Sequence, residues 1–310
     1  MKFNKILLVG YNGNELDDAY WKRIDALTKE KAFIPADDSK LNDQLKHADA
    51  VLVKLGGKVS KEMIDSAPNL KYIGMLGTGF GGIDVGYASS KKITICNIAD
   101  YATEGVAEFT FGVILNYLRE LERGKNQAKD GDYSEATFTG TEIKGKNFGV
   151  IGLGNIGKRT AALAQVFGAK VSYWSKNKKE GFEYQEIENL LKTSDIITLN
   201  LALTQDTKGF LNKERLQLIK KGALLVNPSP MELVDVDALM VRLKQGNISF
   251  ILDHSDEMTE EQLAKLKSFE NCVVYPPIAY TTKEATQLKK GIFVGNLENF
   301  LKGKPTNKVN

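Results

Sequence analysis

Arginine, histidine, cysteine and long apolar runs are all scarce in this 310-residue chain. Two cysteines, Cys96 and Cys272, are too few for a disulfide framework, so we expect buried reduced thiols. With only His47 and His254 as histidines, no metal site is expected. The apolar run in the opening stretch MKFNKILLVG is too short for a signal peptide or a membrane span. These absences predict a cytoplasmic protein with no membrane partner.

Positive charge comes almost entirely from lysine, because only six of the 42 basic residues are arginines. The net charge is +3, and the basic residues are scattered rather than gathered in a stripe. This distribution does not predict binding to nucleic acid. The length and the 42% hydrophobic content are enough for two ordinary globular domains.

Short apolar runs alternate with amphipathic stretches along the whole chain, which predicts α/β architecture with parallel sheets. Strands are expected at KILLVG, ADAVLVKL, LKYIGMLG and ITICN, and a second series starts at NFGVIGLG. Helices are expected over residues 15–30, around 60–66, over 105–125 and over 282–305. The pattern predicts two doubly wound domains, the second inserted into the first if the last helix packs back.

A glycine motif follows the strand that opens the second series. Gly152, Gly154 and Gly157 have the G-x-G-x-x-G spacing, and the helix that follows is rich in alanine. The first glycine allows a tight turn, the second lets a pyrophosphate approach, and the third packs helix against strand. The amides of Asn155 and Ile156 would add donors at the helix N-terminus. The motif predicts a dinucleotide-binding Rossmann domain.

The next strand ends where NAD-binding domains carry an acidic residue for the adenosine ribose. That position is Ser175, followed by Lys176, Lys178 and Lys179. A hydroxyl among lysines suits a 2′-phosphate, which a carboxylate would repel, so NADP(H) is favoured over NAD(H). Alternatively, these lysines belong to a solvated loop with no ligand.

Four further stretches carry a family resemblance: LGTGFGGIDV (76–85), YATEGVAEFTFGVIL (101–115), LTQDTKGFLNKERLQLIKKGALLVN (203–227) and GKPTNKVN (303–310). Together with the glycine motif they resemble the D-isomer-specific 2-hydroxyacid dehydrogenase family over nearly the whole chain. The resemblance implies a flavodoxin-like substrate domain of residues 1–98 and 284–310, and a Rossmann domain of residues 99–283. It also implies a homodimer, a cleft between the domains, and hydride transfer to small 2-oxo acids or from (R)-2-hydroxy acids.

The residues that carry catalysis in that family are altered here. Aligned on VNPSPMELVD, LDHSDEM and YPPIAYTTKEA, the family's arginine, glutamate and histidine fall on Pro230, Asp256 and Pro277. Proline can neither clamp a carboxylate nor transfer a proton. The family mechanism therefore cannot operate unchanged in this chain.

Several residues could substitute. His254, directly after a strand, could be a relocated acid/base oriented by Asp256 or Glu257, or a loop histidine with no catalytic role. By resemblance, Asp253 would bind the nicotinamide carboxamide. An anionic substrate could be received by the backbone of Gly77, Thr78 and Gly79 and by Lys54, which could equally be a surface lysine with no such role. A tyrosine among Tyr101, Tyr275 and Tyr280 could donate a proton to a carbonyl, but aromatic packing is the expected role of these side chains.

Two functions remain open. One is a divergent NAD(P)-dependent oxidoreductase with a reorganised acid/base. The other is a catalytically inactive dinucleotide-binding protein, a redox sensor or partner-binding module. Surviving cofactor residues favour the first, and the loss of three catalytic positions favours the second.

Overall fold

The computed structural model describes residues 2–310. The chain forms two compact units, one holding the residues up to Tyr101 together with Lys283–Asn310, the other holding Ala102–Thr282. We call them unit 1 and unit 2. The expected boundaries at 98 and 283 lie close to these, and they differ because unit 2 begins just before the helix at Thr103 and Lys283 already starts the last helix.

Unit 1 contains a five-stranded sheet in the order β2-β1-β3-β4-β5, with every pairing parallel. The strands are β1 (Phe3–Val9), β2 (Thr28–Ile34), β3 (Ala50–Lys54), β4 (Tyr72–Leu76) and β5 (Thr94–Cys96). The helices are α1 (Asp18–Leu27), α2 (Leu41–Leu45), α3 (Lys61–Asp65), α4 (Val85–Ser90) and α12 (Lys283–Leu301). The order is the flavodoxin-like one, in which ligands bind at the carboxyl ends of the strands.

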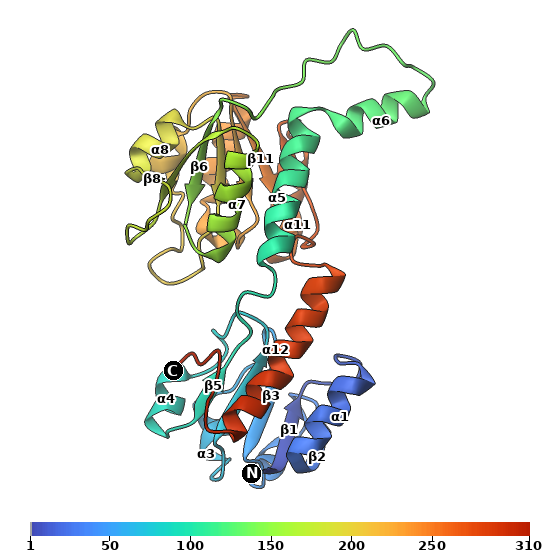
Figure 1. Cartoon of the computed structure of the whole chain (residues 1–310), viewed down its shortest axis with the longest axis vertical. Helices are drawn as coiled ribbons and strands as arrows, with labels where there is room; N and C mark the ends of the chain where they lie inside the picture. Colours follow the sequence, from blue (N-terminus) through green and yellow to red (C-terminus); the bar gives the residue numbers. More distant parts are fainter. Residues whose placement is uncertain (1) are drawn as a thin grey trace. The chain divides into compact units, whose positions relative to one another are not determined.

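Helices cover both faces of this sheet (Figure 1). One apolar layer packs α1 and α12 against the sheet through side chains such as Ile24, Phe293 and Leu297. Helix α12 runs antiparallel to β1, because Phe300 stacks on Phe3 at the start of β1 and Phe293 stacks on Tyr11 beyond its end. The N-terminal turns of α12 therefore lie at the carboxyl edge of the sheet.

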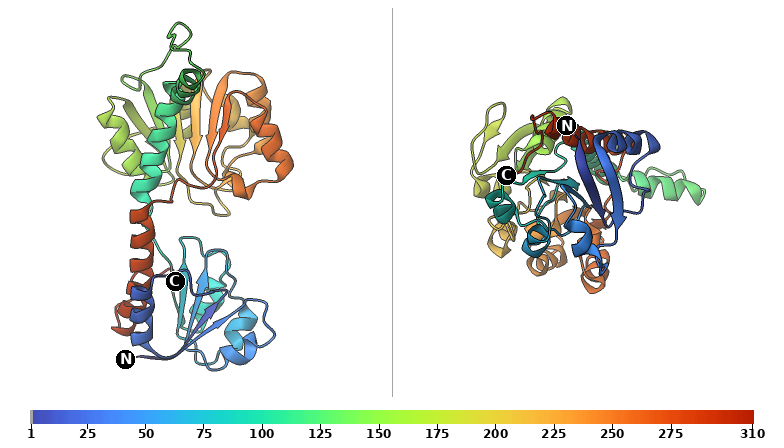
Figure 2. Two further views of the ribbon diagram at one scale, coloured as in Figure 1. Left: turned by 90° about the vertical axis from the view of Figure 1, so that its right-hand side faces the viewer. Right: turned by 90° about the horizontal axis from the view of Figure 1, so that it is seen from below.

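Unit 2 contains a seven-stranded parallel sheet in the order β12-β11-β10-β9-β6-β7-β8. Its strands are β6 (Asn147–Ile151), β7 (Lys170–Trp174), β8 (Glu183–Tyr184), β9 (Ile196–Leu199), β10 (Ala223–Asn227), β11 (Ile248–Leu252) and β12 (Cys272–Val274). Helices α5 (Thr103–Leu118) and α7 (Asn155–Val166) cover one face. The other face is covered by α8 (Ile187–Thr193), α9 (Lys213–Leu218), α10 (Val236–Lys244) and α11 (Glu260–Lys267). The left view of Figure 2 shows this layering.

Two expected helices are shorter than the sequence pattern indicated. The stretch 105–125 is divided into α5 and α6 (Leu121–Lys129), because Glu120 between them adopts the left-handed conformation with φ 51°. The stretch 15–30 holds only α1, since Thr28 already begins β2. In both cases helix propensity continues past the point where the tertiary structure ends the helix.

Helix α6 and the segment after it extend away from the body of unit 2 (Figure 1). No residue of α6 is buried, and Tyr133 beyond it is 82% exposed. Within residues 2–310, no helix has the length and apolarity that a bilayer crossing requires.

Candidate active site

The glycine motif forms the turn between β6 and α7, as the sequence predicted. A Cβ atom on Gly157 would lie 2.0 Å from the carbonyl oxygen of Gly152, so α7 can approach the strand only with glycine there. Gly152 itself has a φ of 95°. By contrast, a Cβ on Gly154 would meet nothing within 4 Å. The turn thus leaves open space beside the N-terminus of α7, which is where glycine motifs of this kind receive a pyrophosphate.

Asn155 and Ile156 form the first turn of α7, with Gly154 as its N-cap. Helical hydrogen bonding begins with the bond from the backbone N–H of Lys158 to the Gly154 carbonyl. The amides that precede Lys158 point out of the helix end, and the helix dipole favours an anion at this end. These residues are therefore placed where a phosphate group would need them.

The basic side chains of the loop after β7 each contact a different residue. Ser175 is buried, and its hydroxyl donates to the carbonyl of Asn177 at 2.7 Å. Lys176 is exposed, with its ammonium 2.9 Å from Asp206. Lys178 lies over the ring of Tyr184, and the ammonium of Lys179 donates to the carbonyl of Leu153 in the glycine turn at 2.7 Å. The loop therefore carries positive charge beside the turn.

Asp253 closes the carboxyl end of β11 and is 1% exposed. Its carboxylate accepts hydrogen bonds from the backbone N–H groups of Ile278 at 3.0 Å and Ala279 at 3.1 Å. Burial raises the pKa of Asp253, and these two bonds oppose the rise. Asp253 thus joins the loops after β11 and β12, and its carboxylate is engaged with this backbone.

His254 lies next to Asp253, with a side chain that is 20% exposed. Its Nδ1 is 3.2 Å from Oε1 of Glu257, whose Oε2 accepts from the backbone N–H of Met231 at 2.8 Å. Burial disfavours the charged imidazole, but the hydrogen bond and charge of Glu257 raise the pKa of His254 above its ordinary value. Asp256, the other carboxylate expected to orient His254, is exposed, and Glu257 forms the pair instead.

The two prolines lie in the neighbouring loops of the same edge. Pro230 precedes the short 3-10 turn Met231–Leu233 after β10, and the hydroxyl of Ser229 donates to the Leu199 carbonyl at 2.8 Å. Pro277 lies between β12 and the backbone bound by Asp253. Glu257 therefore links His254 directly to the loop that carries Pro230.

In unit 1, residues 77–79 follow the carboxyl end of β4. Gly77 accepts from the backbone N–H of Ile98 at 2.9 Å, and the Thr78 hydroxyl donates to the Ile98 carbonyl at 3.0 Å. Asn97 donates to the Thr78 carbonyl at 2.7 Å. Within residues 2–310 the backbone N–H groups of Thr78 and Gly79 form no hydrogen bond, so they are available to an anion.

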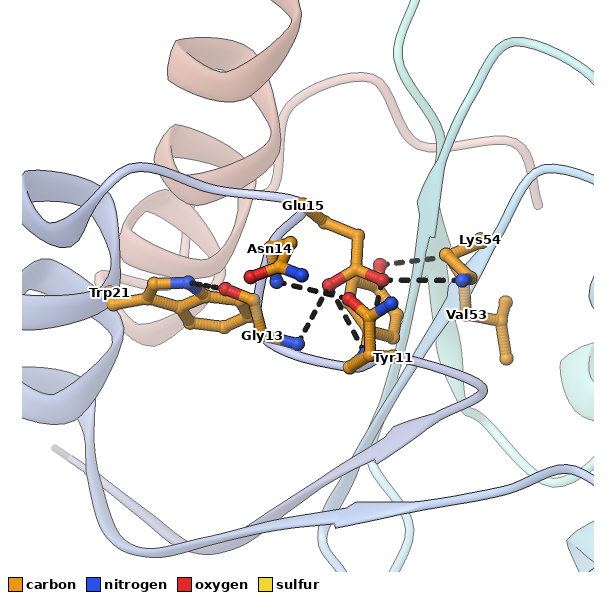
Figure 3. A network of polar contacts seen from close by, with 8 residues as sticks. Tyr11, Gly13, Asn14, Glu15, Trp21, Val53 and Lys54 are labelled. Atoms are coloured by element: carbon orange, nitrogen blue, oxygen red, sulfur yellow. Dashed lines mark hydrogen bonds and ion pairs between the residues drawn. The ribbon is translucent and has the colours of Figure 1, made fainter.

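Lys54, at the end of β3, forms an ion pair with Glu15 across 3.2 Å (Figure 3). Glu15 is only 12% exposed in its side chain and also accepts from the backbone N–H groups of Asn12 and Gly13. Burial raises the pKa of Glu15, but these bonds and Lys54 together hold it below the ordinary value. The charge of Lys54 is thus already balanced within unit 1.

Comparison with known proteins agrees with this architecture. The model of the "D-isomer specific 2-hydroxyacid dehydrogenase, NAD binding domain" family matches residues 111–279. The chain is 33% identical over 291 residues to a glyoxylate reductase of Thermofilum pendens, covering 90% of this chain and 86% of that one.

Two solved structures are similar over most of the chain. A D-lactate dehydrogenase of Aquifex aeolicus, complexed with NAD and lactic acid, is 28% identical with a TM-score of 0.83, covering 96% of each chain. An acyclic imino acid reductase in complex with NADPH and D-Arg is 27% identical with a TM-score of 0.87, covering 99% of this chain and 100% of that one. The chain therefore belongs to the D-isomer-specific 2-hydroxyacid dehydrogenase family, whose members are oxidoreductases acting on CH–OH groups with a Rossmann NAD-binding domain.

Proposed function

We propose that the protein is an NADP(H)-preferring reductase of a small 2-oxo acid or related carbonyl compound, with His254 as its acid/base. The observation that carries the proposal is the His254–Glu257 pair, which lies at the strand ends of the same sheet as the open glycine turn. Ligands of open α/β sheets bind at this edge. The prolines at the family's arginine and histidine positions make a relocated acid necessary.

The cofactor would be held by Gly152, Gly154 and Gly157 and by the amides of Asn155 and Ile156, and it would supply the hydride. Ser175 and Lys176 would face the adenosine ribose, as their place after β7 indicates. NADP(H) is preferred in this proposal because the loop offers ammonium groups and because the ribose position holds Ser175 in place of a carboxylate. Lys176 would exchange its contact with Asp206 for the 2′-phosphate, because an ion pair between two such exposed side chains is weak.

The proton would come from the imidazole of His254. With Nδ1 held by Glu257, the opposite nitrogen Nε2 carries the transferable proton, and it bonds to no other residue among 2–310. During reduction of a carbonyl, a new C–H bond forms from the hydride and the oxygen takes the Nε2 proton. Glu257 would stabilise the charged imidazole before transfer, and Asp253 would keep the loops after β11 and β12 in register.

A second candidate is reduction of a 2-imino acid, favoured by the absence of donors at Pro230 and Pro277. A protonated C=N group already carries its proton, so hydride addition needs less help from an acid than a carbonyl does. The similarity to an acyclic imino acid reductase supports this candidate. Comparing NADPH oxidation with glyoxylate alone and with glyoxylate plus methylamine separates the two reactions.

We further propose a cytoplasmic homodimer, with α6 and its following segment against a second copy. Helix α6, which has no buried residue, and the exposed Tyr133 support this assembly.

The proposal is tested by titrating NADPH and NADH into the purified protein by calorimetry, and then assaying NADPH oxidation with a panel of 2-oxo acids. We expect tighter binding of NADPH and turnover of at least one 2-oxo acid. Tight binding without any turnover, with or without amine, would favour the inactive dinucleotide-binding protein instead. If neither cofactor binds, both functions are wrong.

A further inference from the structure

Three partly buried lysines lie at the carboxyl edge of unit 1, where they could attract an anionic substrate group, and two of them are already paired. Lys54 is bound by Glu15 at 3.2 Å, and Lys290 lies 3.0 Å from both carboxylate oxygens of Asp17. A cation paired with a carboxylate adds little net attraction for a second anion. The third lysine is Lys289.

Lys289 lies in the second turn of α12, and its side chain is half-buried. Its ammonium is 5.6 Å from the centre of the Tyr101 ring. Within residues 2–310 it forms neither an ion pair nor a hydrogen bond, in contrast to its neighbour Lys290. Burial lowers the pKa of Lys289, so desolvation of its charge is not compensated by any anion among residues 2–310.

The helix places Lys289 on the face that packs against the sheet. Phe293 and Asn296 are buried on that face, and they follow Lys289 at the i+4 and i+7 positions. Because α12 runs antiparallel to β1, Lys289 lies beyond Phe293 in the direction of the strands' carboxyl ends.

The same helix supports the loop of residues 77–79. Asn296 donates to the Asn97 carbonyl at 2.7 Å, and Asn97 in turn donates to the Thr78 carbonyl at 2.7 Å. Asn296 is itself fixed, since its oxygen accepts from Thr306 at 2.9 Å and from Asn307 at 2.8 Å. These hydrogen bonds join α12, the helix that carries Lys289, to the loop that carries the free amides of Thr78 and Gly79.

We propose that Lys289 binds the carboxylate of the substrate, together with the backbone amides of Thr78 and Gly79. The ammonium would act as a point charge without the fork geometry of a guanidinium, beside the ring of Tyr101. This assignment rests on the proposed function, and it gives the chain a cation for a 2-oxo or 2-imino acid although Pro230 occupies the family's arginine position. It also accounts for a half-buried ammonium without a carboxylate partner.

The test uses oxalate as a stable two-carbon carboxylate probe, titrated by calorimetry into the full-length protein saturated with NADP⁺. Lys289→Met should weaken oxalate binding by roughly tenfold to a hundredfold, as expected for loss of a charged hydrogen bond. Lys289→Arg should retain most of the affinity. Lys290→Met is the matched control, since the neighbouring lysine is paired with Asp17, and it should bind oxalate as the wild type does.

The melting temperature and the affinity for NADPH, measured on the same variants, show whether the fold and the cofactor site are intact. Unchanged oxalate affinity in Lys289→Met would overturn the assignment, as would a loss that occurs in Lys54→Met but not in Lys289→Met. Failure of the wild type to bind oxalate while it binds NADPH would also overturn it. Failure to bind NADPH would instead contradict the proposed function.

Discussion

The Nδ1 atom of His254 lies 3.2 Å from the Oε1 atom of Glu257. The other oxygen of Glu257 is bound by the backbone N–H of Met231, in the loop after β10 that carries Pro230. A carboxylate held from two sides fixes both the tautomer and the orientation of an imidazole. Through Glu257, the loops after β10 and β11 therefore form one candidate acid/base arrangement.

The pH dependence of reduction follows from this pair. Glu257 raises the pKa of His254, and the protonated imidazole is the form that donates, so reductive kcat/KM should be highest below that pKa and fall as pH rises through it. Glu257→Gln removes the stabilising charge and should move this fall to lower pH. Asp256→Asn is the control, because Asp256 contributes least to the shift. An identical pH profile in Glu257→Gln and the wild type would contradict the pairing.

Two glycines of the cofactor turn should respond differently to alanine. Gly157→Ala brings a methyl group against the Gly152 carbonyl and should cost about 1–3 kcal/mol of unfolding free energy, measured by denaturant titration. Gly154→Ala adds a methyl group in open space, so stability should stay within about 0.5 kcal/mol of the wild type. Its NADPH affinity should nevertheless fall, because that space is where the pyrophosphate fits. Undiminished NADPH binding by Gly154→Ala would place the cofactor elsewhere.

The loop after β7 should determine the choice between cofactors. Lys176→Met should weaken NADPH binding by roughly tenfold and leave NADH binding unchanged, because only the 2′-phosphate needs the ammonium. Lys178→Met provides the comparison, since that ammonium lies over Tyr184. If both variants lost the same affinity for both cofactors, the loop would act only through its general positive charge.

The exposed segment that contains α6 should form the contact between two copies. Replacing both Leu121 and Tyr133 by aspartate introduces charges where the proposed interface excludes water, and neither residue is buried within the chain. Sedimentation should show a dimer for the wild type and a monomer for the double variant, with melting of the monomer still cooperative. A monomeric wild type would rule out the assembly.

Much of the fold could be predicted from strand–helix alternation, and the glycine motif could be found because its spacing reflects a local steric need at Gly157. The break between α5 and α6 could not be predicted, because Glu120 is an ordinary helix former and only tertiary structure places it in the left-handed conformation. The sequence does not show whether Asp256 or Glu257 pairs with His254. The 3-10 turn at Ser255–Glu257 determines that Glu257 is the partner.

Lys289 could not be predicted as a binding residue, since it is one of several lysines in a long helix. Its spacing from Phe293 and Asn296 places the three residues on one face of the helix. That face can be identified as the one against the sheet only once Phe293 and Asn296 are known to be buried. The ion pair of Lys54 with Glu15 could not be predicted either, because Glu15 is distant in sequence and approaches Lys54 only through the pairing of β1 with β3.

The most direct test of the account is NADPH oxidation by the wild type and by His254→Gln in the same assay, with the best 2-oxo acid of the panel at pH 7. We expect turnover by the wild type and a loss of about 10²–10⁴-fold in His254→Gln, with the dissociation constant of NADPH unchanged. Equal turnover by the two proteins would show that His254 is not the acid, and the proposed mechanism would be wrong.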